Sequence, residues 1–322
     1  MEKKDLRIVY MGTPDFAVEA LRCLVEVGYN VVGVITMPDK PAGRGHKIQF
    51  SPVKQYALEH NLPLLQPEKL KDEAFVEALR AWKADLQIVV AFRMLPEVVW
   101  GMPRLGTFNL HASLLPQYRG AAPINWAVIN GDTETGITTF FLKHEIDTGE
   151  VIQQVRVPIA DTDDVGIVHD KLMMLGGRLV VETVDAILAG TVKSIPQEEM
   201  PVVGELRPAP KIFKDTCRID WNLPVKRIYD FVRGLSPYPA AWTELLQPGG
   251  ESVVIKVFET EKIEESHQLA PGTLQTDGKT FIRIAAKDGF VGIRSLQLPG
   301  KKRLKTDELL RGFRLTEGCA VK

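Results

Sequence analysis

Long apolar runs, paired cysteines and a dinucleotide-binding glycine motif are all missing from this sequence. No run of about 18 apolar residues occurs, so no transmembrane helix is expected. Cys23, Cys217 and Cys319 are odd in number and far apart, which argues against a disulfide framework. No C-x-x-C or H-x-x-x-H spacing indicates a bound metal, so none is expected. Gly12 stands alone where G-x-G-x-x-G needs three glycines, which disfavours nicotinamide binding.

What is present is the composition of an ordinary globular protein. The 322 residues are 45% hydrophobic and 25% charged, and this length is enough for two domains. The N-terminal residues lead directly into a strand pattern, without the apolar core of a signal peptide. We therefore expect a cytoplasmic protein with a substantial hydrophobic core.

Charge is distributed unevenly along the chain, although the net charge is only −1. Residues 1–208 contain 21 basic and 27 acidic side chains, whereas residues 209–322 contain 19 basic and 14 acidic ones. A basic C-terminal third suggests contact with a polyanion. The excess is modest, so an uneven distribution by chance is the alternative.

The first part of the chain alternates buried apolar runs with amphipathic segments. Residues 6–11 and 31–35 form two such runs, and a helical pattern containing Ala17, Leu21 and Leu24 lies between them. Further strands are expected at 85–91 and 107–112. This β-α-β order predicts a doubly wound, mostly parallel α/β sheet over residues 1–189.

The composition and the hydrophobic pattern of the sequence change after residue 189. Four prolines and a glycine between 196 and 210 indicate a linker, which we place at 190–208. Short β-rich runs with glycine-containing breaks follow. They predict a second, smaller β-barrel domain over residues 209–322.

Asn109 and His111 are two residues apart near the end of the expected strand 107–112. Their side chains should therefore point to the same face of the sheet. The Asn amide can donate a hydrogen bond to a developing oxyanion, and His titrates near neutral pH. An isolated Asn-x-His is more often structural than catalytic, so the surrounding residues must decide.

Those residues read N-x-H-x-S-L-L-P-x-x-R-G over 109–120, and Asp147-Thr148-Gly149 follows downstream. The combination resembles the 10-formyltetrahydrofolate-dependent formyltransferases, over nearly the whole chain, and most of all the branch that acts on initiator methionyl-tRNA. The resemblance implies a Rossmann-like catalytic domain, an OB-like C-terminal domain that helps to hold tRNA, and a monomer. It implies 10-formyltetrahydrofolate as co-substrate, and the motif requires no metal. The residues it implies are Asn109, His111 and Asp147 for catalysis and Ser113, Leu114, Leu115 and Pro116 for folate contact.

The resemblance suggests a role for each catalytic candidate. Asn109 would donate to the oxyanion of the tetrahedral intermediate. His111 would be a second donor or would transfer a proton, and Asp147 would hold the tautomer of His111 or relay the proton through water. Arg119 could bind a carboxylate or phosphate, or could form a structural salt bridge.

Residues 38–47, PDKPAGRGHK, form a basic segment that follows the second strand. Its glycines and prolines are expected to prevent regular structure. A solvated loop is the simpler interpretation. The resemblance instead implies that Lys40, Arg44 and Lys47 reach the acceptor end of tRNA.

Two other functions remain possible on the sequence. The first is formyl transfer to a small amine, such as glycinamide ribonucleotide or an amino sugar, and the basic segment and the basic β domain argue against it. The second is a non-catalytic RNA-binding protein. Asn109, His111 and Asp147 argue against that alternative, because a binding module has no use for the trio.

Overall fold

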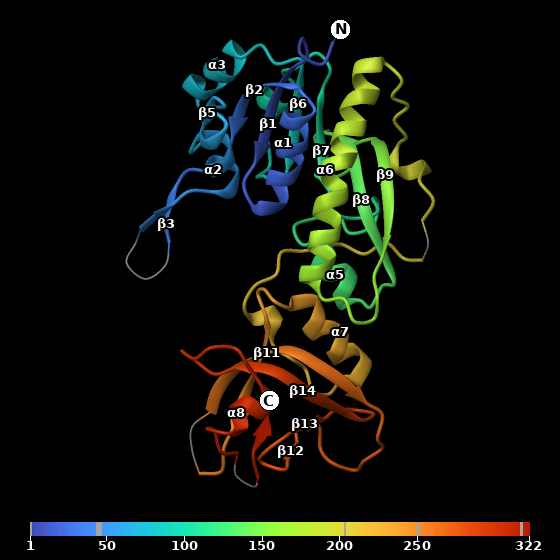
Figure 1. The fold of residues 1–322 in the computed structure, drawn as a ribbon. Coiled ribbons are helices and arrows are strands. Elements are labelled where there is room, and N and C mark those ends of the chain that lie inside the picture. The colour runs from blue at the N-terminus through green and yellow to red at the C-terminus, as the bar shows by residue number, and fades with distance from the viewer. Residues whose placement is uncertain (1, 43–46, 203, 250–251, 316–317) are drawn as a thin grey trace. The chain divides into compact units, whose positions relative to one another are not determined.

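The computed structural model describes residues 2–42, 47–202, 204–249, 252–315 and 318–322 (Figure 1). The chain divides into two compact units, and each is assembled from three segments. The first unit contains Met1–Gly120, Thr135–Pro158 and His169–Pro208. The second contains Ala121–Glu134, Ile159–Val168 and Ala209–Lys322.

A seven-stranded sheet is the framework of the first unit. Its strands lie in the order β5 (Leu64–Leu65), β2 (Asn30–Ile35), β1 (Arg7–Gly12), β6 (Leu86–Val90), β7 (Thr107–His111), β8 (Glu134–Phe141) and β9 (Val151–Pro158). The first five strands in this order pair in parallel, whereas β8 runs antiparallel to β7. The order reverses direction at β1, the position where open α/β sheets bind ligands.

Helices cover both faces of this sheet. They are α1 (Asp15–Glu26), α2 (Pro52–Glu59), α3 (Glu73–Ala81), α4 (Glu97–Trp100) and the part of α6 (Val165–Ala189) that begins at His169. The helices α1 and α6 lie over one face, where Gly177 of α6 comes so close to α1 that an added Cβ would be 2.9 Å from Cys23 Sγ (Figure 1). Phe75 and Leu79 of α3 pack with Val89 on the opposite face.

Strand β1 is buried because its residues alternate between these two helical layers. The hydroxyl of Tyr10 donates to the carbonyl of Ala17 in α1 at 2.5 Å, while Val9 and Met11 belong to the apolar core on the α3 side. Burial raises the pKa of Tyr10 well above its ordinary value.

The basic segment after β2 contains regular structure at its two ends. Strands β3 (Lys40–Ala42) and β4 (Lys47–Gln49) pair antiparallel, with Lys40 opposite Gln49 and Ala42 opposite Lys47. The expectation that proline and glycine prevent regular structure is therefore wrong here, because two short strands satisfy each other's backbone groups. Arg44, at the centre of the segment, lies outside the described residues.

The second unit is a nearly closed antiparallel barrel. Its strands lie in the order β12 (Leu274–Thr276), β13 (Ile282–Ala285), β14 (Phe290–Gln297), β11 (Ser252–Ile263), β10 (Ala241–Leu246) and β16 (Ala320–Val321), and β15 (Leu304–Lys305) pairs with β14. A bridge between Thr273 and Ala320 and a 2.8 Å bond from Val321 N to the Gly272 carbonyl close the barrel. Its helices are α5 (Pro123–Ile129), α7 (Val225–Leu235) and α8 (Thr306–Leu310). Apolar side chains of α7, among them Ile228 and Val232, join the barrel core.

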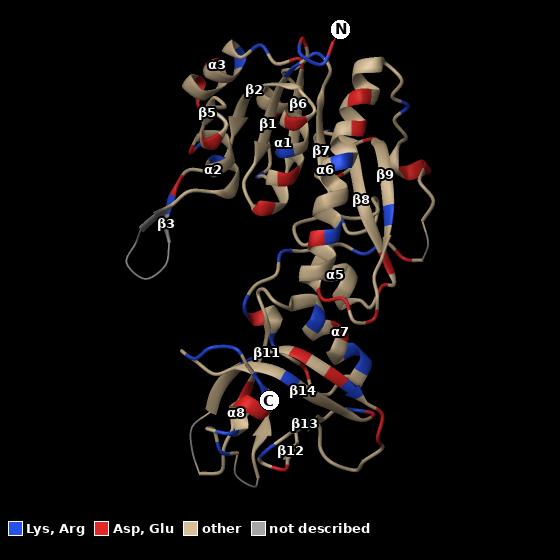
Figure 2. Ribbon diagram, viewed as in Figure 1, with Lys and Arg blue, Asp and Glu red and all other residues tan. Residues whose placement is uncertain are grey.

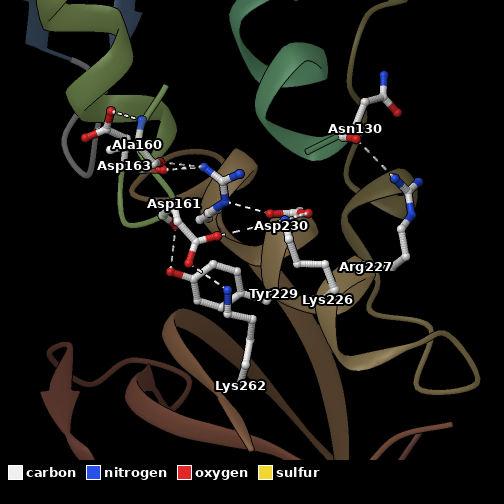
Figure 3. A network of polar contacts seen from close by, with 10 residues as sticks. Asn130, Ala160, Asp161, Asp163, Lys226, Arg227, Tyr229, Asp230 and Lys262 are labelled. Atoms are coloured by element: carbon white, nitrogen blue, oxygen red, sulfur yellow. Dashed lines mark hydrogen bonds and ion pairs between the residues drawn. The ribbon is translucent and has the colours of Figure 1, made fainter. Parts of the chain in front are cut away.

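A polar network joins separate segments of the second unit (Figure 3). Asp230 of α7 accepts hydrogen bonds from Lys226 Nζ at 2.5 Å and from Arg233 Nε at 2.8 Å. Arg233 also donates to the carbonyl of Asp163 at 2.8 Å. The side chains of Asp230 and Arg233 are only 2% and 8% exposed, so each charge depends on the other for compensation.

The predicted fold class, a mostly parallel α/β sheet with a smaller β barrel, is confirmed. The division into residues 1–189, 190–208 and 209–322 stays a prediction. Among the residues that the structure describes, no helix is both long and apolar enough to span a membrane.

Candidate active site

The candidate site lies at the carboxyl end of β7, in the middle of the first unit's sheet. Asn109 pairs with Val89 of β6 on one side and with Phe140 of β8 on the other. Neighbours across a sheet share a face, so Asn109 is on the same face as Val89. Leu110 faces the opposite way, towards α6, where an added Cβ on Gly176 would lie 2.8 Å from it.

Asn109 and His111 are therefore on one face, two residues apart. Asn109 is half-buried, and the side chain of His111 is 8% exposed. The ring of His111 packs edge-on against Phe140, with centroids 6.4 Å apart. Because a strand rather than a loop carries both side chains, their spacing is fixed by the backbone.

The two ring nitrogens of His111 have different surroundings. Nε2 is 2.9 Å from the carbonyl of Tyr118, which can only accept, so Nε2 carries a proton. In the neutral ring Nδ1 is then the acceptor. It faces Asp147 Oδ2 at 3.9 Å, a distance too long for a direct hydrogen bond. The carbonyl of Tyr118, and not Asp147, therefore sets the tautomer of neutral His111.

Asp147 reaches this position from the connection between β8 and β9. Its backbone has φ of 55°, a left-handed conformation that is uncommon for residues other than glycine. Its Oδ2 accepts a hydrogen bond from the backbone N–H of Gly120 at 3.0 Å, and its side chain is 13% exposed. Two residues later, an added Cβ on Gly149 would lie 1.5 Å from the Phe141 carbonyl oxygen, so only glycine fits there.

The loop 113–116 directs most of its side chains inward. The Ser113 hydroxyl donates to the Gln117 carbonyl at 2.6 Å and is fully buried. Leu115 packs with Phe140, and Pro116 is also buried. Leu114 is half-buried, against Gly136. The Ser113 and Leu115 carbonyls and the Leu115 N–H bond to Thr138 and Gln154 within the same unit, so of these four residues Leu114 has the most side-chain surface to offer a ligand.

Sequence reasoning missed Gln197, the partner of Arg119. The guanidinium of Arg119 donates to Gln197 Oε1 at 2.7 and 3.0 Å, so Arg119 forms a structural contact, to a neutral amide and not to a carboxylate. No local signal could have found Gln197, because the residues it contacts are far away in the sequence.

The basic hairpin β3–β4 is anchored at its base. Lys54 Nζ lies 2.5 Å from Asp39 Oδ2, and Gln66 Nε2 donates to Asp39 Oδ1 at 2.9 Å. The hydrogen bond from Lys54 lowers the pKa of Asp39. Lys40 is exposed at the start of β3, and Lys47 starts β4. The structure therefore places these two candidates on the strands β3 and β4, whereas His111 is on β7.

In the second unit, basic side chains lie against aromatic rings, of which Phe213 is exposed and Trp242 is half-buried. Lys211 lies 5.4 Å from the ring centroid of Phe213, and Arg218 lies 5.4 Å from that of Trp242. Phe213 is 59% exposed, and Trp242 Nε1 donates to the carbonyl of Lys214. Figure 2 shows further basic residues on α7. Stacking surfaces next to positive charge are suited to nucleic acid.

Among the described residues, no cluster of three or more His, Cys, Asp or Glu side chains could hold a metal ion. The site therefore offers an amide, an imidazole and a carboxylate. Together they can polarise a carbonyl and move a proton.

Comparisons with known proteins agree over the whole chain. The family model for formyl transferase matches residues 6–184, and that for the formyl transferase C-terminal domain matches residues 211–314. A methionyl-tRNA formyltransferase of Bacteroides fragilis is 83% identical over 322 residues, covering 100% of this chain and 99% of the relative. One from Porphyromonas gingivalis is 52% identical over 323 residues and covers 100% of both chains.

Solved structures share the fold at low identity. HypX from Aquifex aeolicus, solved in complex with tetrahydrofolic acid, is 20% identical with a TM-score of 0.61; the match covers 95% of this chain and 47% of HypX, so this chain spans about half of that protein. The sugar 3N-formyl transferase WlaRD is 17% identical with a TM-score of 0.63, and the match covers 92% of this chain and 99% of WlaRD.

Proposed function

The chain belongs to the formyl transferase family, and from this premise we propose that Asn109, His111 and Asp147 carry its chemistry. Its activity is the transfer of the formyl group of 10-formyltetrahydrofolate to methionyl-tRNA. The observation that carries the proposed site is the approach of His111 Nδ1 to Asp147 Oδ2 beside Asn109, at the carboxyl end of β7.

In the proposed mechanism the α-amino nitrogen of the methionyl group attacks the formyl carbon. The new N–C bond forms a tetrahedral intermediate with an oxyanion, to which the Asn109 amide donates. The C–N10 bond then breaks, and the proton lost by the amine ends on N10. Because Nε2 of His111 is occupied by the Tyr118 carbonyl, Nδ1 is the atom available for substrate. This supports proton transfer shared by His111 Nδ1 and Asp147 Oδ2.

The folate donor is proposed to lie against the loop 113–116. Ser113, Leu115 and Pro116 are buried, so they would shape the loop. The Ser113 and Leu115 carbonyls and the Leu115 N–H already bond to Thr138 and Gln154, so other backbone groups of the loop would bind the polar edge of the pteridine. Leu114 is the half-buried member of this set and the one whose side chain has surface to offer.

The tRNA contacts are proposed in two places. Lys40, Arg44 and Lys47 of the basic segment 38–47 would reach the acceptor end of initiator methionyl-tRNA, because a small acceptor needs no such basic segment. The exposed Phe213 and the half-buried Trp242, with their cations, would hold another part of the tRNA. Catalysis is thus assigned to residues 1–189, tRNA holding to 209–322, and connection to 190–208.

We further propose that the enzyme works as a monomer. We also propose that it works in the cytoplasm, where translation takes place and where its two substrates, charged tRNA and the folate donor, are present. Light scattering on the purified protein, with and without tRNA, tests the first statement. A mass of two chains would contradict it.

The function is tested by supplying the purified protein with 10-formyltetrahydrofolate and either charged initiator tRNA or small amines. Formylation of the tRNA should be much the faster. Faster formylation of glycinamide ribonucleotide or an amino sugar would overturn the tRNA assignment. Replacing His111 with Ala should remove turnover and leave tRNA affinity nearly unchanged; turnover at the wild-type rate would contradict the proposed role of His111.

A further inference from the structure

Gln197 has a fully occupied hydrogen-bonding side chain in the core of the first unit. The residue is 1% exposed and lies in the segment after α6. Its Oε1 accepts both bonds from Arg119, at 2.7 and 3.0 Å. Its Nε2 donates to the backbone carbonyls of Asp147 and Gly149, each at 2.8 Å. Both donors and both acceptor positions of the amide are therefore used.

The segment that carries Gln197 lies along the start of β9. Val151 and Ile195 exchange two backbone hydrogen bonds of 2.8 Å each. Just before them, Ser194 Oγ donates to Glu150 Oε2 at 2.5 Å. Residues 194–197 are thus attached at several points, but among these contacts only the one made by Gln197 reaches Asp147.

We propose that Gln197 is a positioning residue for formyl transfer, which acts by holding Asp147 in front of His111. Asp147 has an uncommon left-handed backbone, which persists only where the surroundings hold it. Gln197 donates to the backbone carbonyl of Asp147. The carboxylate of Asp147 accepts from the N–H of Gly120, the residue after Arg119. The amide of Gln197 therefore links the two chain segments whose separation sets the distance from Asp147 to His111.

This inference rests on the proposed catalytic role of Asp147. Without the two Nε2 bonds, the carbonyls of Asp147 and Gly149 lose their buried partner and the turn can relax. A displacement of about 1 Å at a catalytic group costs on the order of 100-fold in rate. Folate and tRNA contacts lie elsewhere in the proposed site, so their KM values should change little.

The test compares Gln197→Met, which keeps the length but removes every hydrogen bond, with Gln197→Glu, which keeps the acceptor for Arg119 and removes both donors. Both should lower kcat by about 10- to 100-fold and leave the KM values for 10-formyltetrahydrofolate and methionyl-tRNA nearly unchanged. Ser194→Ala is the matched control, because it loosens the same segment without touching Asp147. Thermal unfolding of every variant accompanies the kinetics. A wild-type kcat in both Gln197 variants, or an equal loss in Ser194→Ala, would overturn the proposal.

A double-mutant cycle shows whether Gln197 acts through Asp147. Once Asp147→Asn has removed the carboxylate, adding Gln197→Met should cost little further activity. Independent, multiplicative losses would refute the inference alone. If Asp147→Asn itself keeps the wild-type rate, the proposed role of Asp147 fails, and the inference fails with it.

Discussion

Replacing Asp230 with Ala is expected to destabilise the second unit by about 3–5 kcal/mol, the usual cost of removing one partner of a buried ion pair. Asp230 is 2% exposed, and it is the acceptor for both Lys226 and Arg233 (Figure 3). Its loss removes the carboxylate that compensates the buried guanidinium of Arg233, which keeps the backbone carbonyl of Asp163 and the ring of Tyr229 as neutral partners. The uncompensated charge, more than the lost bonds, accounts for this magnitude.

Two control variants separate that explanation from a simple loss of contacts. Lys226 is 50% exposed, so Lys226→Met should cost no more than about 1 kcal/mol. The double variant Asp230→Leu with Arg233→Met removes both buried charges while keeping side-chain volume. It should be more stable than Asp230→Ala, because replacing a whole buried pair by apolar residues is often neutral.

Differential scanning calorimetry of the purified protein is the assay, since the two units can unfold in separate transitions. The loss should appear in the transition to which the second unit contributes. A cost for Asp230→Ala no larger than for Lys226→Met would refute the reasoning. So would a double variant that is less stable than Asp230→Ala.

Three further predictions concern the site and its surroundings. Asn109→Ala should lower kcat by about 100- to 1,000-fold, the loss typical of one oxyanion donor, while the circular dichroism spectrum stays that of the wild type. A change in KM without a fall in kcat would exclude that role. The KM for methionyl-tRNA should rise steeply with salt concentration. Changing Lys40, Arg44 or Lys47 to Ala should reduce the slope of log KM against log salt concentration by about 1 for each side chain that binds a phosphate. Unchanged slopes would show that these side chains do not contact the tRNA. The pKa of Asp161 is lowered, chiefly by the hydrogen bond from Lys262, so its contribution to stability is present above the unfolded-state pKa near 4 and is lost as the pH falls below it. Asp161→Asn should therefore flatten the decline in unfolding temperature between about pH 5 and pH 2; the same decline as the wild type would contradict this.

Local patterns in the sequence predicted the elements that are buried along their whole length. Strand β7 was expected at 107–112 and ends one residue earlier, at His111. Its position is determined by its own apolar residues, which must lie between two helical layers.

Features that depend on distant partners were beyond the reach of those patterns. The strands β3 and β4 have three residues each, too few to show alternation, and they exist because they pair with each other. The contact between Gln197 and the carbonyls of Asp147 and Gly149 joins residues about 50 apart through backbone groups that every sequence possesses. Composition could indicate a linker at 190–208, but it could not indicate that the side chain of Gln197 would reach the candidate site.

These two kinds of feature divide the candidate site. Asn109 and His111 are fixed by β7, and Tyr118 sets the tautomer of His111 through its carbonyl. Asp147 alone comes from a loop, with an uncommon backbone conformation and a 3.9 Å gap to His111. Strands deform less than the connections between them, so the carboxylate of Asp147 can shift more easily than the side chains of Asn109 and His111. Substitutions that alter turnover without contacting either substrate should then occur mainly where Asp147 is held, at Gly120, Gly149 and Gln197.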